Sequence, residues 1–353
     1  MSDHLGKAYP GLAEKLQKRS FASLPTPVSH HALEFAGRSR TIVVKHDDQT
    51  STLYGGNKIR KLEYIFQRAI ERDALRVATF GTVGSNHALA TAIIARSVGL
   101  GCTCFLAHQK PAANIPAILD AHRALGTELV PVGGGVSRLD VYRRYLQNRR
   151  VWVIPLGGSS WLGAVGFVNA GMEIAAQIEA GELETPKRIY MANGTMGSVA
   201  GLALGLALAN LPTEVHAIRI TETRFANWAG MLRLISKTAS LLNRIDPAIP
   251  ANLAGRCRIV WRDDFVAGGY ANVDDATLRA VEFAKDNLGL SLETTYTGKT
   301  MAALLHDLEA NRAGTSSLFW NTYNSRSLPT PGAEARAPLA LPESFKRYYE
   351  ISA

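Results

Sequence analysis

The pattern of apolar and polar positions between residues 60 and 220 predicts helices and strands in regular alternation. Helices are expected at 61–72, 87–98, 115–125 and 199–209. Strands are expected at 76–80, 102–107, 128–132, 151–155, 188–192 and 214–220. Strands joined through helices of this length pair in parallel. The pattern therefore predicts an α/β fold with two open, twisted, mostly parallel sheets, each flanked by helices.

A glycine pair at 157–158, followed by a helix that starts near Gly163, indicates a joint between two such strand–helix series. The chain has 353 residues and so exceeds the length at which a single core usually stops growing. We expect a small domain over residues 52–162. Residues 1–51 and 163–353 are expected to form a larger one.

Composition narrows the range of partners. Hydrophobic residues make up 46% of the chain and charged residues 20%, which is typical of a protein that folds throughout. The net charge of +9 would suit nucleic acid if it were clustered, but the densest basic stretch, 143–150, has an apolar side and is expected to be a solvated helix face. No nucleic-acid partner is expected. The positive charge also suits an anionic cofactor or substrate.

The three cysteines, Cys102, Cys104 and Cys257, fit neither a zinc spacing nor a disulfide framework, which favours a reducing compartment and no metal site. The amino terminus has no apolar stretch of signal-peptide length, and no later run is long enough to span a bilayer. The sequence therefore predicts a cytoplasmic protein without a membrane partner.

The first segment that can carry chemistry is Gly55-Gly56-Asn57-Lys58, where a glycine pair precedes a lysine at a helix start. The helix macrodipole disfavours a positive charge there, which lowers the pKa of the lysine and raises the fraction of free amine able to attack an aldehyde. By position alone, a surface lysine of the first turn is the more common case.

Two further segments lie between a strand and a helix. Backbone N–H groups of the turn at 81–87 could bind a carboxylate, although Ser85 could also be a simple helix N-cap. Glycines and hydroxyls at 193–201 could bind a phosphate. That segment lacks the P-loop pattern and the glycine spacing of a dinucleotide fold, although Glu222 follows the next strand. The sequence contains no G-x-S-x-G or H-E-x-x-H motif, which argues against a serine hydrolase or a zinc hydrolase.

Taken in order, these segments resemble the D-cysteine desulfhydrase and 1-aminocyclopropane-1-carboxylate (ACC) deaminase family, which is related to the tryptophan synthase β-subunit (fold type II). The resemblance covers roughly residues 20 to 310. The matching segments are 24–27, 45–48, 55–63, 85–87, 154–159, 194–201 and 295–299. The run Gly-Gly-Asn-Lys-x-Arg-Lys-Leu-Glu at 55–63 is the most specific of them, and it favours a cofactor role for Lys58.

The resemblance implies that pyridoxal 5′-phosphate (PLP) is attached to Lys58 and that Asn86 hydrogen-bonds its phenolic oxygen. The larger domain would bind PLP, and the small domain would carry Lys58 and the carboxylate-binding loop. The substrate carboxylate would be held by Ser85, Asn86 and His87. The residues expected to bind the phosphate are Gly194, Thr195, Met196, Gly197 and Ser198.

Tyr296 and Tyr270 match two tyrosines of the family's active site, and either could protonate a leaving group. Without the resemblance, each would be interpreted as a core aromatic with a bonded hydroxyl. The freed amine of Lys58 is the expected general base. With Ser85, these residues are the predicted catalytic set.

The sequence also departs from the family. Thr297 stands where the deaminases carry glutamate, as in the desulfhydrase-like members, and a neutral residue there favours chemistry that needs a modest electron sink, such as β-elimination. Gly84 and residues 88–91 lack the family's glutamine and arginine. Asn321–Asn324 replaces His-Thr-Gly-Gly, so we expect Thr322 to remain near the cofactor ring nitrogen in a reshaped pocket.

The leading hypothesis is a PLP-dependent lyase that eliminates a β-substituent from a small amino acid and gives a 2-oxo acid and ammonia. ACC-type ring opening, racemisation and a non-catalytic binding protein are the alternatives. An NAD-binding protein using Gly194 and Glu222 would leave Lys58 unexplained. The resemblance implies a homodimer, and neither the substrate nor its enantiomer follows from the sequence.

Overall fold

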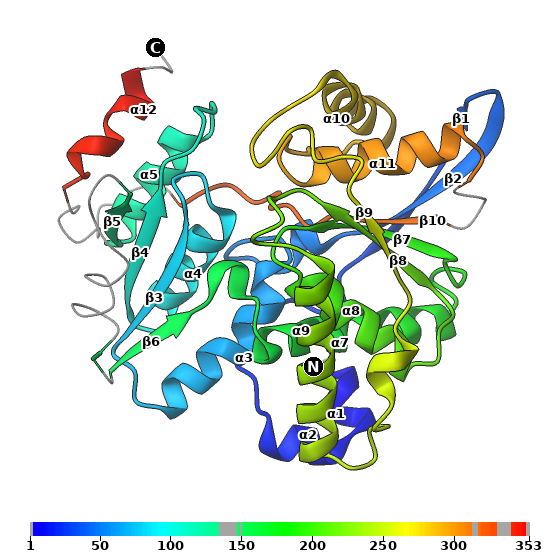
Figure 1. The fold of residues 1–353 in the computed structure, drawn as a ribbon, viewed down its shortest axis with the longest axis horizontal. Helices are drawn as coiled ribbons and strands as arrows, with labels where there is room; N and C mark the ends of the chain where they lie inside the picture. Colours follow the sequence, from blue (N-terminus) through cyan, green and yellow to red (C-terminus); the bar gives the residue numbers. More distant parts are fainter. Residues whose placement is uncertain (1–2, 134–146, 149, 313–316, 330–339, 351–353) are drawn as a thin grey trace.

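Two β-sheets lie side by side in the chain, each covered by helices (Figure 1). The computed structural model describes residues 3–133, 147–148, 150–312, 317–329 and 340–350. The basic stretch at 143–150 therefore lies largely outside the described residues. The predicted fold class is confirmed, because two mostly parallel sheets with flanking helices are present.

The larger sheet has the strand order β1-β2-β10-β7-β8-β9. Only β1 and β2 pair antiparallel, and the other neighbours are parallel. The last strand in the sequence, β10, lies in the interior of the sheet between β2 and β7. The bounds are β1 (Val28–Phe35), β2 (Arg38–Lys45), β7 (Arg188–Asn193), β8 (Glu214–Arg219), β9 (Ile259–Arg262) and β10 (Ser317–Trp320).

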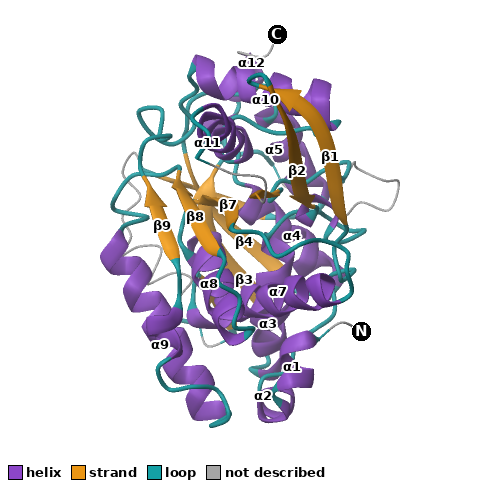
Figure 2. Cartoon of the chain, turned by 90° about the vertical axis from the view of Figure 1, so that its right-hand side faces the viewer, coloured by secondary structure: helices purple, strands orange, loops and turns teal. Residues whose placement is uncertain are grey.

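Helices cover both faces of this sheet (Figures 1 and 2). One face carries α7 (Trp161–Glu179), α8 (Gly197–Leu208) and α9 (Trp228–Ile245), and the other carries α10 (Asp275–Leu288) and α11 (Thr297–Glu309). Every residue of α8 is buried, as expected of a helix that is apolar all round. The short helices α1 (His4–Ala8) and α2 (Pro10–Lys15) pack on α7 and α9.

The smaller sheet has the order β5-β4-β3-β6 and is parallel throughout. It is covered by α4 and α5, while α3 packs against both α4 and α7 and so bridges the two sheets. Its strands are β3 (Arg76–Thr82), β4 (Gly101–Ala107), β5 (Glu128–Val132) and β6 (Val151–Ile154). The helices are α3 (Lys58–Glu71), α4 (Asn86–Ser97), α5 (Ile115–Ala124) and α12 (Arg347–Glu350) near the carboxyl end.

The helices and strands expected between 60 and 220 all occur, with ends that shift by a few residues. The strands of the smaller sheet fall within residues 52–162, and the domain boundary predicted next to Gly163 lies in the first turn of α7. The division into two domains remains a prediction. No helix in the described part of the chain is long and apolar enough to cross a membrane.

Candidate active site

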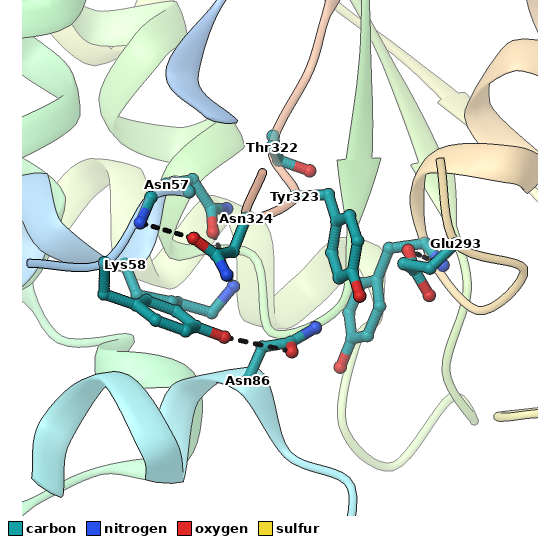
Figure 3. Close-up of a pocket in the computed structure, with 11 residues that line it drawn as sticks. Asn57, Lys58, Asn86, Glu293, Thr322, Tyr323 and Asn324 are labelled. Atoms are coloured by element: carbon teal, nitrogen blue, oxygen red, sulfur yellow. Dashed lines mark hydrogen bonds between the residues drawn. The ribbon is translucent and has the colours of Figure 1, made fainter. Parts of the chain in front are cut away.

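A pocket of about 310 Å³ lies between the two sheets (Figure 3). Two of its sides follow the carboxyl ends of parallel strands, where α/β proteins usually bind ligands, because Asn86 follows β3 and Thr322 follows β10. The lining residues are Tyr54, Gly55, Gly56, Asn57, Lys58, Asn86, Glu293, Tyr296, Thr322, Tyr323 and Asn324.

The glycine pair sets the position of Lys58 at the start of α3. A Cβ at Gly55 would overlap the carbonyl oxygen of Asp48, and Gly56 has φ +92°, which favours glycine. The Gly55 N–H donates to Asn324 Oδ1 at 2.6 Å, and the Asn57 N–H donates to the Thr322 carbonyl at 3.2 Å. The segment after β10 therefore fixes the loop that precedes Lys58.

Lys58 is partly buried, and its Nζ donates to Asn57 Oδ1 at 2.6 Å. The same Nζ lies 5.7 Å from the centre of the Tyr296 ring. Burial lowers the pKa of Lys58 to about 8, against the attraction of the Glu293 carboxylate. At neutral pH a useful fraction of this amine is therefore free to act as a nucleophile or a base.

Arg60, two residues further along α3, ties the helix to the larger sheet through buried ion pairs. Its guanidinium donates to Asp47 at 2.7 Å and to Glu173 of α7 at 2.9 Å. Lys45 Nζ, at the end of β2, lies 2.7 Å from Glu173. Burial alone would lower the pKa of Arg60, but the two carboxylates outweigh it and raise that pKa. Two positive and two negative side chains thus balance in the interior.

Lys61 is a buried lysine that the sequence analysis did not select. Its Nζ donates to the Gly157 carbonyl at 3.0 Å and to Ser159 Oγ at 3.4 Å. Burial, and then the charge of Lys58, lowers the pKa of Lys61 well below its usual value. Within the described residues, neither of these two lysines forms an ion pair with a carboxylate. Lys61 lies three residues after Lys58 and therefore shares a helix face with it. This spacing is the sequence signal that could have identified Lys61.

The glycine loop at 194–198 lies next to Lys61, through Ser159. Ser159 Oγ lies 2.7 Å from Thr195 Oγ1 and accepts from the Gly197 N–H at 3.2 Å. Ser198 Oγ accepts from Asn57 Nδ2 at 3.0 Å, which links this loop to the residue before Lys58. Of the other two loop residues, Gly194 approaches the Tyr296 ring, and Met196, in a left-handed conformation, approaches Gly230 of α9.

Of the three residues expected to bind a carboxylate, Asn86 reaches the pocket, where its Oδ1 accepts from the Tyr54 hydroxyl at 3.2 Å (Figure 3). Ser85 is the N-cap of α4, and its Oγ accepts from the Ala88 N–H at 3.2 Å. The His87 ring is buried outside the pocket lining, with Nε2 2.9 Å from Thr79 Oγ1.

The two predicted tyrosines are adjacent. The Tyr296 hydroxyl donates to the Tyr270 hydroxyl at 3.2 Å, and the rings meet edge to face with their centres 5.8 Å apart. Burial raises the pKa of Tyr270 and that of Tyr296, the latter well above its usual value, with Tyr270 and Glu293 raising it further. Both hydroxyls therefore keep their protons at neutral pH and can act as proton donors.

Glu293 lines the pocket, and no role was predicted for it from the sequence. Its carboxylate accepts from the backbone N–H groups of Thr295, Tyr296 and Thr297 at 2.7–2.8 Å. Burial raises the pKa of Glu293 despite these hydrogen bonds. Thr297 is buried and its Oγ1 accepts from the Glu293 N–H, so the threonine expected to act at the cofactor faces Glu293. Glu293 precedes the helix whose first N–H groups it binds, and no capping pattern in the sequence marked it.

The segment that departs from the family, Asn321–Asn324, forms one wall of the pocket. Thr322, Tyr323 and Asn324 all line it, and in Figure 3 the Tyr323 ring lies between Asn86 and Glu293. Burial, and then the Glu293 carboxylate, raises the pKa of Tyr323. A reshaped pocket was predicted here, and the Tyr323 ring lines part of it.

Comparison with known proteins decides the family. The family model described as pyridoxal-phosphate dependent enzyme matches residues 20–322. The chain belongs to this family. Among curated pyridoxal-phosphate relatives, D-cysteine desulfhydrase of Salmonella typhimurium is 31% identical over 84% of this chain and 90% of its own. D-cysteine desulfhydrase of Salmonella schwarzengrund is 32% identical over 82% of this chain and 87% of its own.

Solved structures of pyridoxal-phosphate enzymes share the fold. A structure described as an ACC deaminase homologue matches with a TM-score of 0.70 and 26% identity, over 88% of this chain and 93% of its own. A pyridoxal 5′-phosphate-dependent aspartate racemase matches with a TM-score of 0.58 and 17% identity, over 92% and 97%, which supports the fold alone.

The residues present fit pyridoxal phosphate. The cofactor joins an aldehyde to a phosphate, and the chain offers Lys58, with its lowered pKa, one helical turn from the buried amine of Lys61. The backbone N–H groups at the start of α8 and the hydroxyls of Ser159 and Thr195 favour an anion beside Lys61. The cofactor dependence predicted from the sequence is confirmed by the family.

Proposed function

We propose that the protein is a lyase that eliminates the β-substituent from a small amino acid, with D-cysteine as the first candidate substrate. The enzyme would then convert D-cysteine and water to pyruvate, hydrogen sulfide and ammonia. The observation that carries the proposal is the pairing of Lys58, whose pKa is about 8, with the protonated Tyr296, in a chain 31% identical to a D-cysteine desulfhydrase.

Lys58 and its neighbours would hold the cofactor. Lys58 would attach it, Asn86 would hydrogen-bond its phenolic oxygen, and Thr322 would interact with its ring nitrogen. Lys61 and the five residues 194–198 hold the phosphate. When bound, pyridoxal phosphate supplies an electron sink for bond cleavage at the substrate α-carbon. The Lys58 amine would act as the base for the α-proton, for which a pKa of about 8 is suitable.

The amino-acid carboxylate would be bound at the start of α4. The Ser85 hydroxyl, the Asn86 side chain and the backbone N–H groups of Asn86 and His87 lie at this helix N-terminus, where an anion is favoured. The His87 ring, bonded to Thr79, would then support the turn from behind.

Tyr296 and Tyr270 would supply the proton that the leaving sulfur needs. Their hydroxyls are hydrogen-bonded to each other, and burial keeps both protonated. We also propose that the enzyme acts as a cytoplasmic homodimer. The three cysteines are free thiols, which agrees with a reducing compartment.

The cofactor part of the proposal is tested with the purified holoenzyme. We expect a yellow protein whose colour is bleached by borohydride, with the cofactor fixed on the peptide that contains Lys58 by mass spectrometry. Lys58→Ala should carry no cofactor fixed by borohydride. The control variant Lys237→Ala, which changes an exposed lysine of α9, should still carry it. Label on another lysine would refute the assignment.

The reaction part is tested by measuring sulfide, pyruvate and ammonia from D-cysteine and L-cysteine. We expect release from D-cysteine, with Lys58→Ala lowering turnover by at least about 10²-fold, the usual contribution of a general base. Loss of optical rotation without sulfide would instead identify racemisation, and a spectral change without any product would identify a binding protein. Either outcome refutes the lyase.

A further inference from the structure

Lys299 is a buried lysine near the pocket to which the proposed function gives no role. It lies in the first turn of α11, three residues after Tyr296, and its side chain is inaccessible to solvent. A positive charge is disfavoured there twice, by burial and by the helix macrodipole. Within the described residues it forms no ion pair, so other groups must stabilise its ammonium.

The partners of Lys299 are two backbone carbonyls of one loop, between β9 and α10. Lys299 Nζ donates to the Val266 oxygen at 2.7 Å and to the Gly269 oxygen at 3.0 Å. The same two oxygens also accept from the Gly269 and Asn272 N–H groups, at 3.1 and 3.3 Å. One ammonium thus joins two consecutive turns of the loop.

This loop needs an external support. Ala267, Gly268, Gly269 and Ala271 have φ values of +53°, +76°, +136° and +56°. Left-handed geometry is unfavourable at each alanine, so contacts from outside the loop must offset this cost. Besides Lys299, the loop meets α11 through the hydroxyl pair of Tyr270 and Tyr296 and through the Phe265 ring, whose centre lies 5.7 Å from that of His306.

The charge state of Lys299 suits this role. Burial lowers its pKa to about 8, while the carboxylates of Asp274, Glu293 and Glu222 oppose that shift. The amine is therefore mostly protonated at neutral pH and can donate to both carbonyls. Charge-assisted hydrogen bonds of this kind are stronger than neutral ones.

We propose that Lys299 is a positioning residue: by binding the carbonyl oxygens of Val266 and Gly269 it holds the loop 266–272 against α11 and keeps the Tyr270 hydroxyl beside that of Tyr296. Its effect on turnover rests on the proposed role of Tyr270 as a proton donor. Its effect on the loop does not.

The test is amide hydrogen exchange of the holoenzyme, followed for peptides that cover 263–274 and 297–309. Lys299→Met removes both donors without much change in shape, and we expect the loop peptide to exchange about tenfold faster or more, with α11 unchanged. Lys285→Met, an exposed lysine of α10, is the control. Loop exchange at the wild-type rate in Lys299→Met would overturn the proposal.

Lys299→Gln provides a second variant, since it keeps one donor group and is less disruptive if the methionine variant does not fold. We expect its loop exchange to lie between those of wild type and Lys299→Met, and wild-type exchange would again overturn the proposal. In turnover of D-cysteine, Lys299→Met should lower kcat as Tyr270→Phe does, and the double variant should lose no more.

The proposed function and the positioning role of Lys299 can be refuted independently. If D-cysteine is not a substrate, the exchange result still decides the role of Lys299. If Tyr270→Phe turns over normally, the proton-donor role is refuted. Faster exchange of the loop in Lys299→Met then still supports the positioning, and unchanged exchange still refutes it.

Discussion

Lys58 and Arg60 stand two residues apart on α3, yet their surroundings are opposite. Arg60 is buried and its guanidinium contacts two carboxylates, which raise its pKa. Among the residues that the structure describes, Lys58 has one hydrogen-bond partner, an amide oxygen, and burial lowers its pKa to about 8. Burial with charged partners fixes a cation, whereas burial without them makes an amine reactive. One helix therefore carries both an anchor, the buried cation of Arg60 with its carboxylate partners, and an amine with a lowered pKa.

The largest effect is expected on the anchor side. Arg60→Met would leave the Asp47 and Glu173 carboxylates buried beside a single cation, Lys45, and we expect the free energy of unfolding to fall by about 3–5 kcal/mol. Urea denaturation followed by circular dichroism measures this. Arg68→Met, which removes a partly exposed ion pair from the same helix, should cost less than about 1 kcal/mol. Equal losses of stability in the two variants would contradict the claim that the buried ion pairs of Arg60 anchor the helix.

A smaller effect is expected where α7 supports the anchor. A Cβ at Gly166 would overlap the backbone carbonyl of Arg60, so Gly166→Ala must separate α7 from α3. We expect the free energy of unfolding to fall by about 1–3 kcal/mol, as in other overpacked cores. Gly255→Ala has open space and should change stability little. A fully stable Gly166→Ala would show that the anchor does not depend on close contact.

The lowered pKa of Lys58, which lines the pocket, predicts that the stability of the cofactor-free protein depends on pH. Because the folded pKa of Lys58 is about 8 and its usual value 10.5, the unfolded chain binds more protons between those values. The stability of wild type relative to Lys58→Met should therefore rise with pH in this window, by no more than about 1.4 kcal/mol per unit, and stay flat below it. Denaturation at several pH values measures it, with Lys237→Met as control. A difference independent of pH would contradict the lowered pKa.

The smallest effect concerns the orientation of Asn86. Tyr54→Phe removes the hydroxyl that donates to Asn86 Oδ1 and should weaken cofactor binding by roughly 2- to 12-fold, the equivalent of about 0.5–1.5 kcal/mol. Titration of the cofactor-free protein by absorbance gives the dissociation constant. Tyr349→Phe, whose hydroxyl bonds to Asp120 far from the pocket, should bind as wild type does. Equal weakening in both variants would argue against a specific role for Tyr54.

The elements could be predicted from the sequence because strands and helices follow from local periodicity. The role of Lys58 was predicted from a contiguous run of residues that resembles the family, and it stays a prediction. The same resemblance pointed to Asn86, Thr322, Tyr296 and the loop at 194–198. Each of these lies just after a strand or just before a helix.

The rest could not be predicted because it depends on which way side chains point and on distant partners. Nothing local shows that the His87 ring turns toward Thr79 or that Thr297 bonds to Glu293. The contact between Arg60 and Glu173 spans 113 positions of the sequence. Hydrophobic periodicity has no information about such pairs.

The place of β10 in the fold has a consequence for synthesis of the chain on the ribosome. This strand fills the gap between β2 and β7, and Asn324, just beyond it, bonds to Gly55 across 269 positions of sequence. The loop before Lys58 therefore cannot reach its final form until β10 and the segment after it have been translated. A nascent chain that stops before β10 would lack the contacts that hold this loop.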